Sequence, residues 1–461
     1  GTLSGLTRGS DNTTAASHSD GATVTDASEY TKWGASQTGD IITAPGLWSL
    51  DNYGNKLIAT IVDGATFEWD SDGSPSTRAT IVANAPTAAL QTLVSTPDRH
   101  LVFFGTETTI GTTSTQDDMY IRFSDQESID ATTSYAPSAT NTAGTQRLAD
   151  GTRIVAAIRG RDAIYVWTDT SLFIMRFVGA PFVFSFQQVG TNCGLIGKNA
   201  AVEVDGSAYW MSENGFFRYT GKLESLACLV EDYVYDDINT VPKNHIYAGL
   251  NNLFGEVTWF YPGSGAASNN RSVTYNFMDS TPERPVWTTS SLARSSWFDS
   301  SIFGKPHATE YDSSATSDTT VGNTDGVTVY YEHETGQDQI KAGARTGISA
   351  SIQSGDFDIS MGQGGGADLR GDGEHMMKIR RVLPDFLTQT GDARVTLNLK
   401  NYPTDSEASS SLGPFTSTTS TDKIDTRARA RAIALKVDNT SIKQHWKLGT
   451  FRLDIQADGR R

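Results

Sequence analysis

Two aromatic segments of this 461-residue chain decide its fold, Tyr165-Val-Trp-Thr-Asp-Thr-Ser-Leu-Phe173 and Tyr209-Trp-Met-Ser-Glu-Asn-Gly-Phe-Phe217. In each segment an aromatic strand reaches a short polar turn and returns as a second aromatic strand. The two segments align at an offset of 44 residues, and Lys56–Phe67 has a similar hairpin pattern. Because a four-stranded propeller blade takes about 40–45 residues, this period predicts a β-propeller.

The sequence around these hairpins has the same character. Short apolar runs alternate with Gly, Asp, Asn, Ser and Thr, and only Leu223–Ile238 has the pattern of a short helix. Between Leu47 and about Gly336 there is room for six or seven blades, with an array of β-sandwiches as the alternative. The apolar runs that we expect to be strands are Lys56–Val62, Leu101–Phe104, Ile154–Ile158, Ala163–Trp167, Leu172–Phe177 and Ala201–Val204.

The composition also favours an all-β protein. Glycine occurs 43 times, aromatic residues make up 10% of the chain, and charged residues make up only 20%. Two cysteines, Cys193 and Cys228, exclude a disulfide scaffold and a Cys-ligated structural zinc. We expect two free thiols, with a single bridge as the alternative. The most apolar stretch, Leu172–Phe186, is broken by Arg, Gly and Pro, so we expect no membrane span.

The C-terminal part of the chain has a different pattern. Gly355–Asp372 is glycine-rich, and longer alternating strands follow it at Arg394–Lys400 and Thr450–Ile455. The sequence therefore predicts four parts: an extended arm over 1–44, a β-propeller-like domain over 45–354, a linker over 355–374, and a β-sandwich or barrel platform domain over 375–461.

The charge is unevenly distributed along the chain. The net charge is −16, but residues 375–461 contain 15 Lys and Arg against 9 Asp and Glu. Residues 1–374 therefore contain 22 basic against 44 acidic groups. A surface this acidic does not bind nucleic acid by counterion release. The basic C-terminal part is expected to face a different partner.

One motif concentrates that basic charge. If 427–431 is a strand, Arg427, Arg429 and Arg431 lie on one face, Ile433 and Leu435 continue that face, and alanines line the other. Three Arg side chains at period two repel one another unless an anion covers them. We expect the carboxylates of a neighbouring subunit to do so, with solvent and DNA phosphate as alternatives.

Motifs of catalysis and of ligand binding are sparse. The chain has no Gly-x-Ser-x-Gly elbow and no Walker loop. We predict no catalytic, cofactor-binding or metal-binding residues. Gly362–Ala367 approximates the dinucleotide fingerprint, and we interpret it as a flexible linker, with a phosphate cradle as the alternative. Glu332-His333-Glu334 is interpreted as a solvated strand edge, with metal ligation as the alternative. Asp70–Gly73 resembles the start of a calcium loop and is interpreted as a turn. Glu231-Asp232 with Asp236-Asp237 is interpreted as a solvated acidic face, with the carboxylate pair of a glycosidase as the alternative.

Several phrases occur together in a recognisable order. Over about residues 45–461, the pattern and order of the chain resemble those of the tail nozzle proteins of short-tailed bacteriophages. That family is also called tail tubular protein B or packaged-DNA stabilisation protein. The phrases are Met119-Tyr-Ile-Arg-Phe-Ser-Asp125, Arg153-Ile-Val-Ala-Ala-Ile-Arg-Gly-Arg161 with the Tyr165 hairpin, Phe184-Ser-Phe-Gln-Gln-Val-Gly190, Cys193-Gly-Leu-Ile-Gly197, the Tyr209 hairpin, and Trp446-Lys-Leu-Gly-Thr-Phe-Arg-Leu-Asp454.

The resemblance implies a structural virion protein. Such nozzles are homohexamers below the portal and its adaptor, and they carry a β-propeller domain and a barrel-like platform. They continue the channel for packaged double-stranded DNA without sequence-specific binding, retain the genome, and dock tail fibres or tailspikes. The resemblance thus implies a location in the virion tail after assembly in the bacterial cytoplasm. The alternatives are a carbohydrate-active depolymerase and a host-receptor-binding adhesin.

Overall fold

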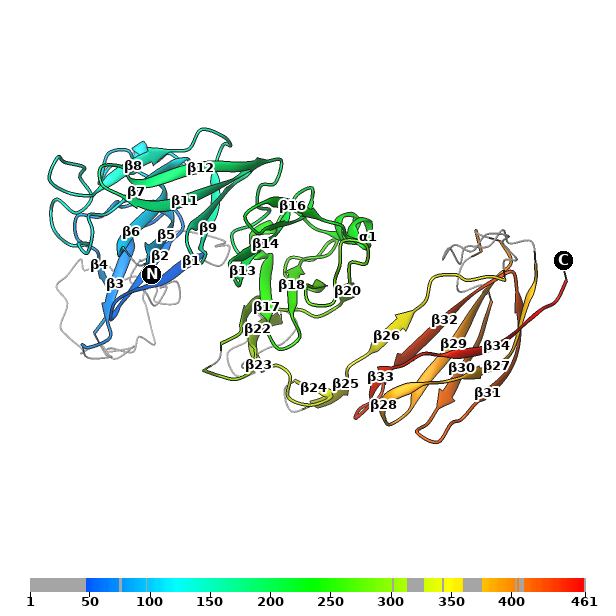
Figure 1. Ribbon diagram of the computed structural model, residues 1–461. Coiled ribbons are helices and arrows are strands. Elements are labelled where there is room, and N and C mark those ends of the chain that lie inside the picture. The colour runs from blue at the N-terminus through cyan, green and yellow to red at the C-terminus, as the bar shows by residue number, and fades with distance from the viewer. Residues whose placement is uncertain are drawn as a thin grey trace, which may run out of the picture. The chain divides into compact units, whose positions relative to one another are not determined.

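The computed structural model (Figure 1) describes residues 47–73, 77–96, 98–300, 302–312, 327–341, 344–359, 375–402, 404–405 and 410–459. The predicted arm over 1–44 lies outside the described residues. The chain divides into two compact units, Gly1–Tyr331 and Glu332–Arg461, and each is described by itself.

Six antiparallel sheets follow one another in the described part of the first unit. Five have four strands and the last has three, and in each sheet every strand pairs with the next along the chain. The strands are β1 Trp48–Tyr53, β2 Lys56–Ile61, β3 Thr66–Asp70 and β4 Thr80–Ile81; β5 Ala89–Ser95, β6 His100–Thr106, β7 Tyr120–Phe123 and β8 Gly144–Arg147; β9 Ile154–Arg159, β10 Ile164–Thr168, β11 Ser171–Gly179 and β12 Val183–Thr191; β13 Ala201–Val204, β14 Ser207–Ser212, β15 Gly215–Tyr219 and β16 Leu223–Leu226; β17 Tyr247–Asn251, β18 Glu256–Tyr261, β19 Arg271–Asn276 and β20 Trp287–Ser290; and β21 Ser296–Phe298, β22 His307–Asp312 and β23 Val327–Glu332.

The sheets are connected as propeller blades. The first strand of each sheet contacts the first strand of the next, in the order β1, β5, β9, β13, β17 and β21. The remaining strands of each sheet follow outward from there in chain order, three in each of the first five sheets and two in the sixth. The unit is thus β-propeller-like, and all six apolar runs predicted as strands are strands. The one predicted helix, Leu223–Ile238, is instead strand β16 followed by the short helix α1, Glu231–Asp237.

The 44-residue repeat corresponds to one blade. Tyr165 pairs with Ile174 between β10 and β11, and Tyr209 pairs with Arg218 between β14 and β15. The aligned hairpins are therefore the second and third strands of neighbouring sheets in the same register. Lys56–Phe67 spans β2 and β3, which are again a second and a third strand.

Aromatic side chains fill the space between successive sheets. Trp167 of β10, Trp210 of β14 and Trp259 of β18 are completely buried. The rings of Trp167 and Trp210 meet edge to face with centroids 5.4 Å apart. The Trp210 indole donates to the Cys193 carbonyl at 2.8 Å, so the chain entering the fourth sheet is tied to the second strand of that sheet.

Two glycines let the chain cross between sheets. A Cβ on Gly194 would lie 2.0 Å from the backbone oxygen of Asp169, and one on Gly197 would lie 2.3 Å from that of Lys243. Since both neighbours are backbone atoms, neither can move aside as a flexible side chain would. The phrase Cys193-Gly-Leu-Ile-Gly197 is thus required by close packing.

We expect Gly194→Ala to destabilise the first unit by about 1–3 kcal/mol, because the added methyl group overpacks a backbone contact. Urea unfolding followed by tryptophan fluorescence measures this change. Gly355→Ala is the control, since a Cβ there meets nothing within 4 Å. Equal unfolding midpoints for Gly194→Ala and the unsubstituted protein would contradict the prediction.

A buried lysine joins three sheets near their first strands. Lys198, just before β13, donates from Nζ to Ser49 Oγ of β1 at 2.8 Å and to the Leu90 carbonyl of β5 at 3.3 Å. Burial lowers the pKa of Lys198 to about 8; Arg153 lowers it further, and Asp63 opposes the shift. Both hydrogen-bond partners of Lys198 are uncharged, whereas burial disfavours the charged form of its ammonium group.

This lysine makes stability depend on pH. In the unfolded chain the pKa of lysine is about 10.4. Between about pH 8 and this value, the unfolded chain binds more protons than the folded chain, so the free energy of unfolding rises with pH. We expect Lys198→Met to remove this rise in stability with pH. At neutral pH the substitution should also relieve up to about 3 kcal/mol of the cost of burying the charged ammonium group, reduced by the free energy of the two lost hydrogen bonds. Unfolding titrations from pH 7 to pH 11 test this, with the exposed Lys222→Met as control. An unchanged pH slope in Lys198→Met would contradict it.

The second unit is a β-sandwich. Sheets β26-β32-β29-β30 and β31-β27-β34 enclose a core that includes Val395, Leu397, Ala428 and Ala430, and two-stranded sheets β24-β25 and β28-β33 complete the unit (Figure 1). The strands are β24 Asp338–Lys341, β25 Ala344–Gly347, β26 Ala350–Gln353, β27 Met377–Leu383, β28 Phe386–Thr390, β29 Ala393–Lys400, β30 Ser411–Ser417, β31 Ile424–Ala430, β32 Ala432–Asn439, β33 His445–Leu448 and β34 Arg452–Ala457.

The boundary between the units lies earlier than the sequence predicted. The propeller-like unit ends at Tyr331 rather than at 354. Strand β26 pairs with β32 of the sandwich, and Phe357 exchanges two backbone hydrogen bonds of 3.0 Å with Ile433. The predicted linker over 355–374 therefore connects two strands of one unit, and its residues 360–374 lie outside the described residues.

Candidate functional site

The sandwich carries a basic surface on its three-stranded sheet. Along β31, Asp425, Arg427 and Arg429 are exposed, whereas the residues between them are buried. The small side chains of Ala428 and Ala430 let the opposite sheet pack closely beneath, as the sequence predicted. We call the side chains of Lys378, Arg380, Arg427 and Arg429 the basic face.

The register of the sheet places like charges opposite one another. Lys378 of β27 is the direct partner of Arg429 of β31. The pairing then shifts, from Ile379 with Ala428 to Arg381 with Asp425, which leaves Arg380 opposite the segment 426–427. Cross-strand pairs of like charge are destabilising. The sheet therefore bears an electrostatic cost in the isolated chain.

Acidic neighbours offset only part of this charge. Asp425 binds the Arg381 Nε at 2.9 Å and the Lys423 Nζ at 3.3 Å, and Asp458 binds the Arg429 Nε at 2.5 Å. Within the described residues, no ion pair involves the side chains of Lys378, Arg380 or Arg427. The basic face thus keeps three cations that are open to an anionic partner.

The predicted arginine ladder is partly wrong. Arg427 and Arg429 share the exposed face, but β31 ends at Ala430 and the chain bends at Arg431. The backbone N–H of Arg431 donates to the Lys400 carbonyl, and the chain then enters β32 of the other sheet. Arg431 is therefore not part of the ladder, and Ile433 is buried in the core instead of continuing the face.

The acidic cluster of the sequence analysis lies on α1. Asp237 pairs with Arg271 at 3.2 Å, whereas Asp232 and Asp236 are exposed and have no ion pair with any described residue. The Tyr235 hydroxyl points inward and donates to the Ser212 carbonyl at 2.7 Å. The cluster thus presents carboxylates to solvent and does not line an aromatic cleft.

Two of the other sequence candidates lie within the described residues and one lies outside them. Asp70–Gly73 is the predicted turn, closed by the Asp72 N–H donating to Asp70 Oδ1 at 2.9 Å. In the part of the chain that the structure describes, no group of three His, Cys, Asp or Glu is placed to hold a metal ion. Glu332-His333-Glu334 forms the end of β23 and the residues after it. Gly362–Ala367 lies outside the described residues.

Both cysteines are free thiols, as predicted. Burial raises the pKa of Cys193 and of Cys228 to about 11, which keeps both protonated near neutral pH. Among the described helices, none has the length and the apolar character needed to cross a membrane.

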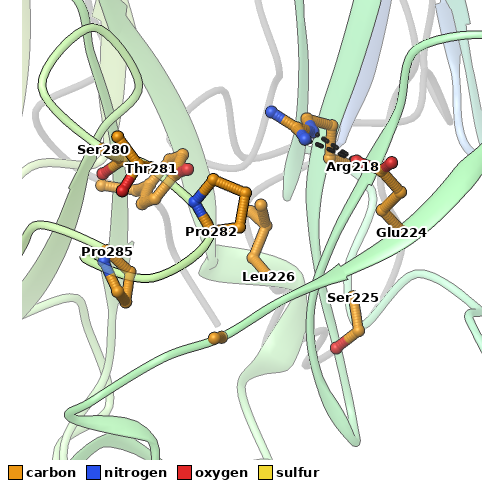
Figure 2. Close-up of a pocket in the computed structure, with 10 residues that line it drawn as sticks. Arg218, Glu224, Ser225, Leu226, Ser280, Thr281, Pro282 and Pro285 are labelled. Carbon is orange, nitrogen blue, oxygen red and sulfur yellow. Dashed lines mark hydrogen bonds and ion pairs between the residues drawn. The ribbon is translucent and has the colours of Figure 1, made fainter.

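A cavity of about 330 Å³ lies between the fourth and fifth sheets of the first unit. Figure 2 shows Arg218 and Glu224 bound together at one side and Pro282 and Pro285 at the other. The Arg218 guanidinium donates twice to Glu224 Oε2, at 3.1 and 2.5 Å, and these bonds lower the pKa of Glu224. The pair neutralises itself. The lining holds one carboxylate, whereas most glycoside hydrolysis uses two.

Comparisons with known proteins give likenesses to solved structures alone. No protein-family model and no curated protein matches the chain. BamB from Moraxella catarrhalis is 12% identical, with 62% of this chain and 82% of BamB covered and a TM-score of 0.32. The β-propeller domain of Cps50 (Swd1) from Myceliophteria thermophila is 10% identical, with coverages of 67% and 91% and a TM-score of 0.34. Sqt1 from Saccharomyces cerevisiae is 10% identical, with coverages of 57% and 69% and a TM-score of 0.37.

Proposed function

We propose that the chain is a structural protein of the tail nozzle of a short-tailed bacteriophage. In this role six copies surround the channel below the portal and its adaptor, retain the packaged double-stranded DNA, and dock tail fibres or tailspikes. The protein is assembled in the bacterial cytoplasm and remains in the virion tail. The ordered sequence phrases from Met119 to Asp454 support this family of functions.

The charge distribution is the observation that carries the proposal furthest. The basic face is concentrated on one sheet of the sandwich, whereas residues 1–374 contain twice as many acidic as basic groups. An acidic wall repels DNA phosphates, so DNA could slide past it without being held. A localised basic face suits a contact between protein subunits, because Arg pairs with carboxylates in a fixed geometry.

The phrases behind the resemblance have structural roles in the propeller-like unit. Met119–Asp125 contains β7, Arg153–Arg161 contains β9, and Cys193–Gly197 forms the close crossing into the fourth sheet. These segments build a third strand of the second sheet, the first strand of the third sheet, and a connection between blades. The proposal therefore assigns the unit to a rigid scaffold, and it assigns no chemical step to it.

The decisive experiment is genome retention in particles. Particles assembled without this protein should package DNA and then lose it, measured as nuclease-sensitive DNA released over time. Six-fold density below the portal in images of wild-type particles would agree with the proposal. Particles that retain DNA without the protein would overturn it. Turnover of host glycans by the purified protein would favour the depolymerase alternative.

We expect the double variant Arg380→Glu/Arg427→Glu to fold normally yet to enter particles at least tenfold less than the wild type. Two exposed cations that repel each other become anions, so an acidic partner surface is repelled. Quantitative blotting of purified particles measures incorporation. Arg452→Glu, on the exposed edge strand β34 of the same sheet, should enter normally. Equal incorporation of all variants would contradict a role for the basic face.

A further inference from the structure

We infer that the basic face binds helix α1 of a second copy of this chain, through Asp232 and Asp236. The inference rests on the self-assembly that the proposed function includes, and it names the surface that meets the basic face.

Helix α1 carries negative charge that its own surroundings do not balance. Asp232 and Asp236 are exposed at positions i and i+4, where like charges repel across one turn. Asp236 also lies in the last turn, which already bears partial negative charge from unsatisfied carbonyls and contains no basic residue. Its neighbour Asp237 is balanced by Arg271 at 3.2 Å. Asp236 lacks such an ion pair within the described residues, so an external cation would stabilise it.

The basic face has the opposite charge at a matching spacing. Arg380 of β27 and Arg427 of β31 lie beside each other across the sheet, so their Cβ atoms are about 5 Å apart. Residues at i and i+4 of a helix have Cβ atoms about 5–6 Å apart. Neither arginine has an ion pair within the described residues. A helix packed on this pair could therefore engage two carboxylates at once, and both like-charge repulsions would be relieved.

The surroundings of α1 also suit a protein partner. Tyr233, between the two carboxylates in sequence, is 55% exposed, and Leu229, just before the helix, is 76% exposed. Tyrosine and arginine are enriched at interface centres, and a guanidinium can stack on a tyrosine ring. These groups add apolar contact area to the charge pairs, which a small inorganic anion could not use.

The two surfaces belong to different regions of the chain. The contact would therefore be heterologous, with the basic face of one copy on α1 of the next. Heterologous contacts close into rings when the rotation between copies allows it. Each copy in such a ring would use both surfaces, and no basic face would be left uncovered.

A reciprocal charge exchange tests this contact in the full-length protein. Sedimentation velocity over a concentration series should show self-association of the wild type that weakens at high salt. Arg427→Glu alone and Asp236→Lys alone should each weaken it at least tenfold. Combining both in one chain should restore association to within about threefold of the wild type. Asp236→Lys should keep α1 folded, because a cation in the last turn is favourable.

Matched controls separate this contact from net charge and from the proposed function. Arg452→Glu and Glu283→Lys alter charge by the same amounts elsewhere and should leave association unchanged. A monomeric wild type, effects that do not depend on concentration, or failure of the double exchange would overturn the inference. If the exchange restores association but particles do not contain the protein, the proposed function fails and the contact stands. If particles require the protein but the exchange does not restore association, the proposed contact fails and the proposed function stands.

Discussion

The packing of large aromatic rings between successive sheets is the interaction on which the first unit depends. A four-stranded antiparallel sheet has two faces and cannot bury either alone. Trp167 against Trp210, and Phe216 against Trp259 at 4.9 Å, join the third sheet to the fourth and the fourth to the fifth. Because each ring serves two sheets, no sheet of this series has a complete core by itself. Cooperative stability along the series follows from this shared burial.

Close packing constrains the connections between sheets as strongly as the sheets themselves. The chain entering the fourth sheet passes within contact distance of the backbone at Asp169 and Lys243, and only glycine fits at both crossings. The residue after the second crossing is Lys198, whose ammonium group donates hydrogen bonds to residues of β1 and β5. A side chain that reaches across three sheets fixes their spacing, but it does so with a group that burial disfavours. The hydrogen bonds that connect its first strands are therefore formed at some cost to the stability of the unit.

The sequence predicted features that depend on local periodicity and missed those that depend on distant pairing. The 44-residue repeat and the alternation of Ala428 and Ala430 with arginine follow from the period of a strand, and both are present in the structure. The unit boundary was misplaced because glycine-rich 355–374 resembles a linker, whereas β26 before it pairs with β32, which lies much later in the chain. Lys378 and Arg380 were missed for the same reason, since only cross-strand register places them beside the arginines. Arg431 continues the alternating pattern in sequence, but the bend after Ala430 removes it from the strand.

Like charges that persist on a folded surface need an explanation in terms of what the surface meets. In the sandwich, Asp425 and Asp458 already neutralise Arg381 and Arg429, so acidic partners can be placed on this sheet. Lys378, Arg380 and Arg427 nevertheless lack ion pairs within the described residues, and cross-strand repulsion among them opposes folding of the isolated unit. The repulsion disappears when carboxylates cover the face. In the proposed contact, the assembled state would be favoured both by the new ion pairs and by the relief of this like-charge repulsion in each free chain.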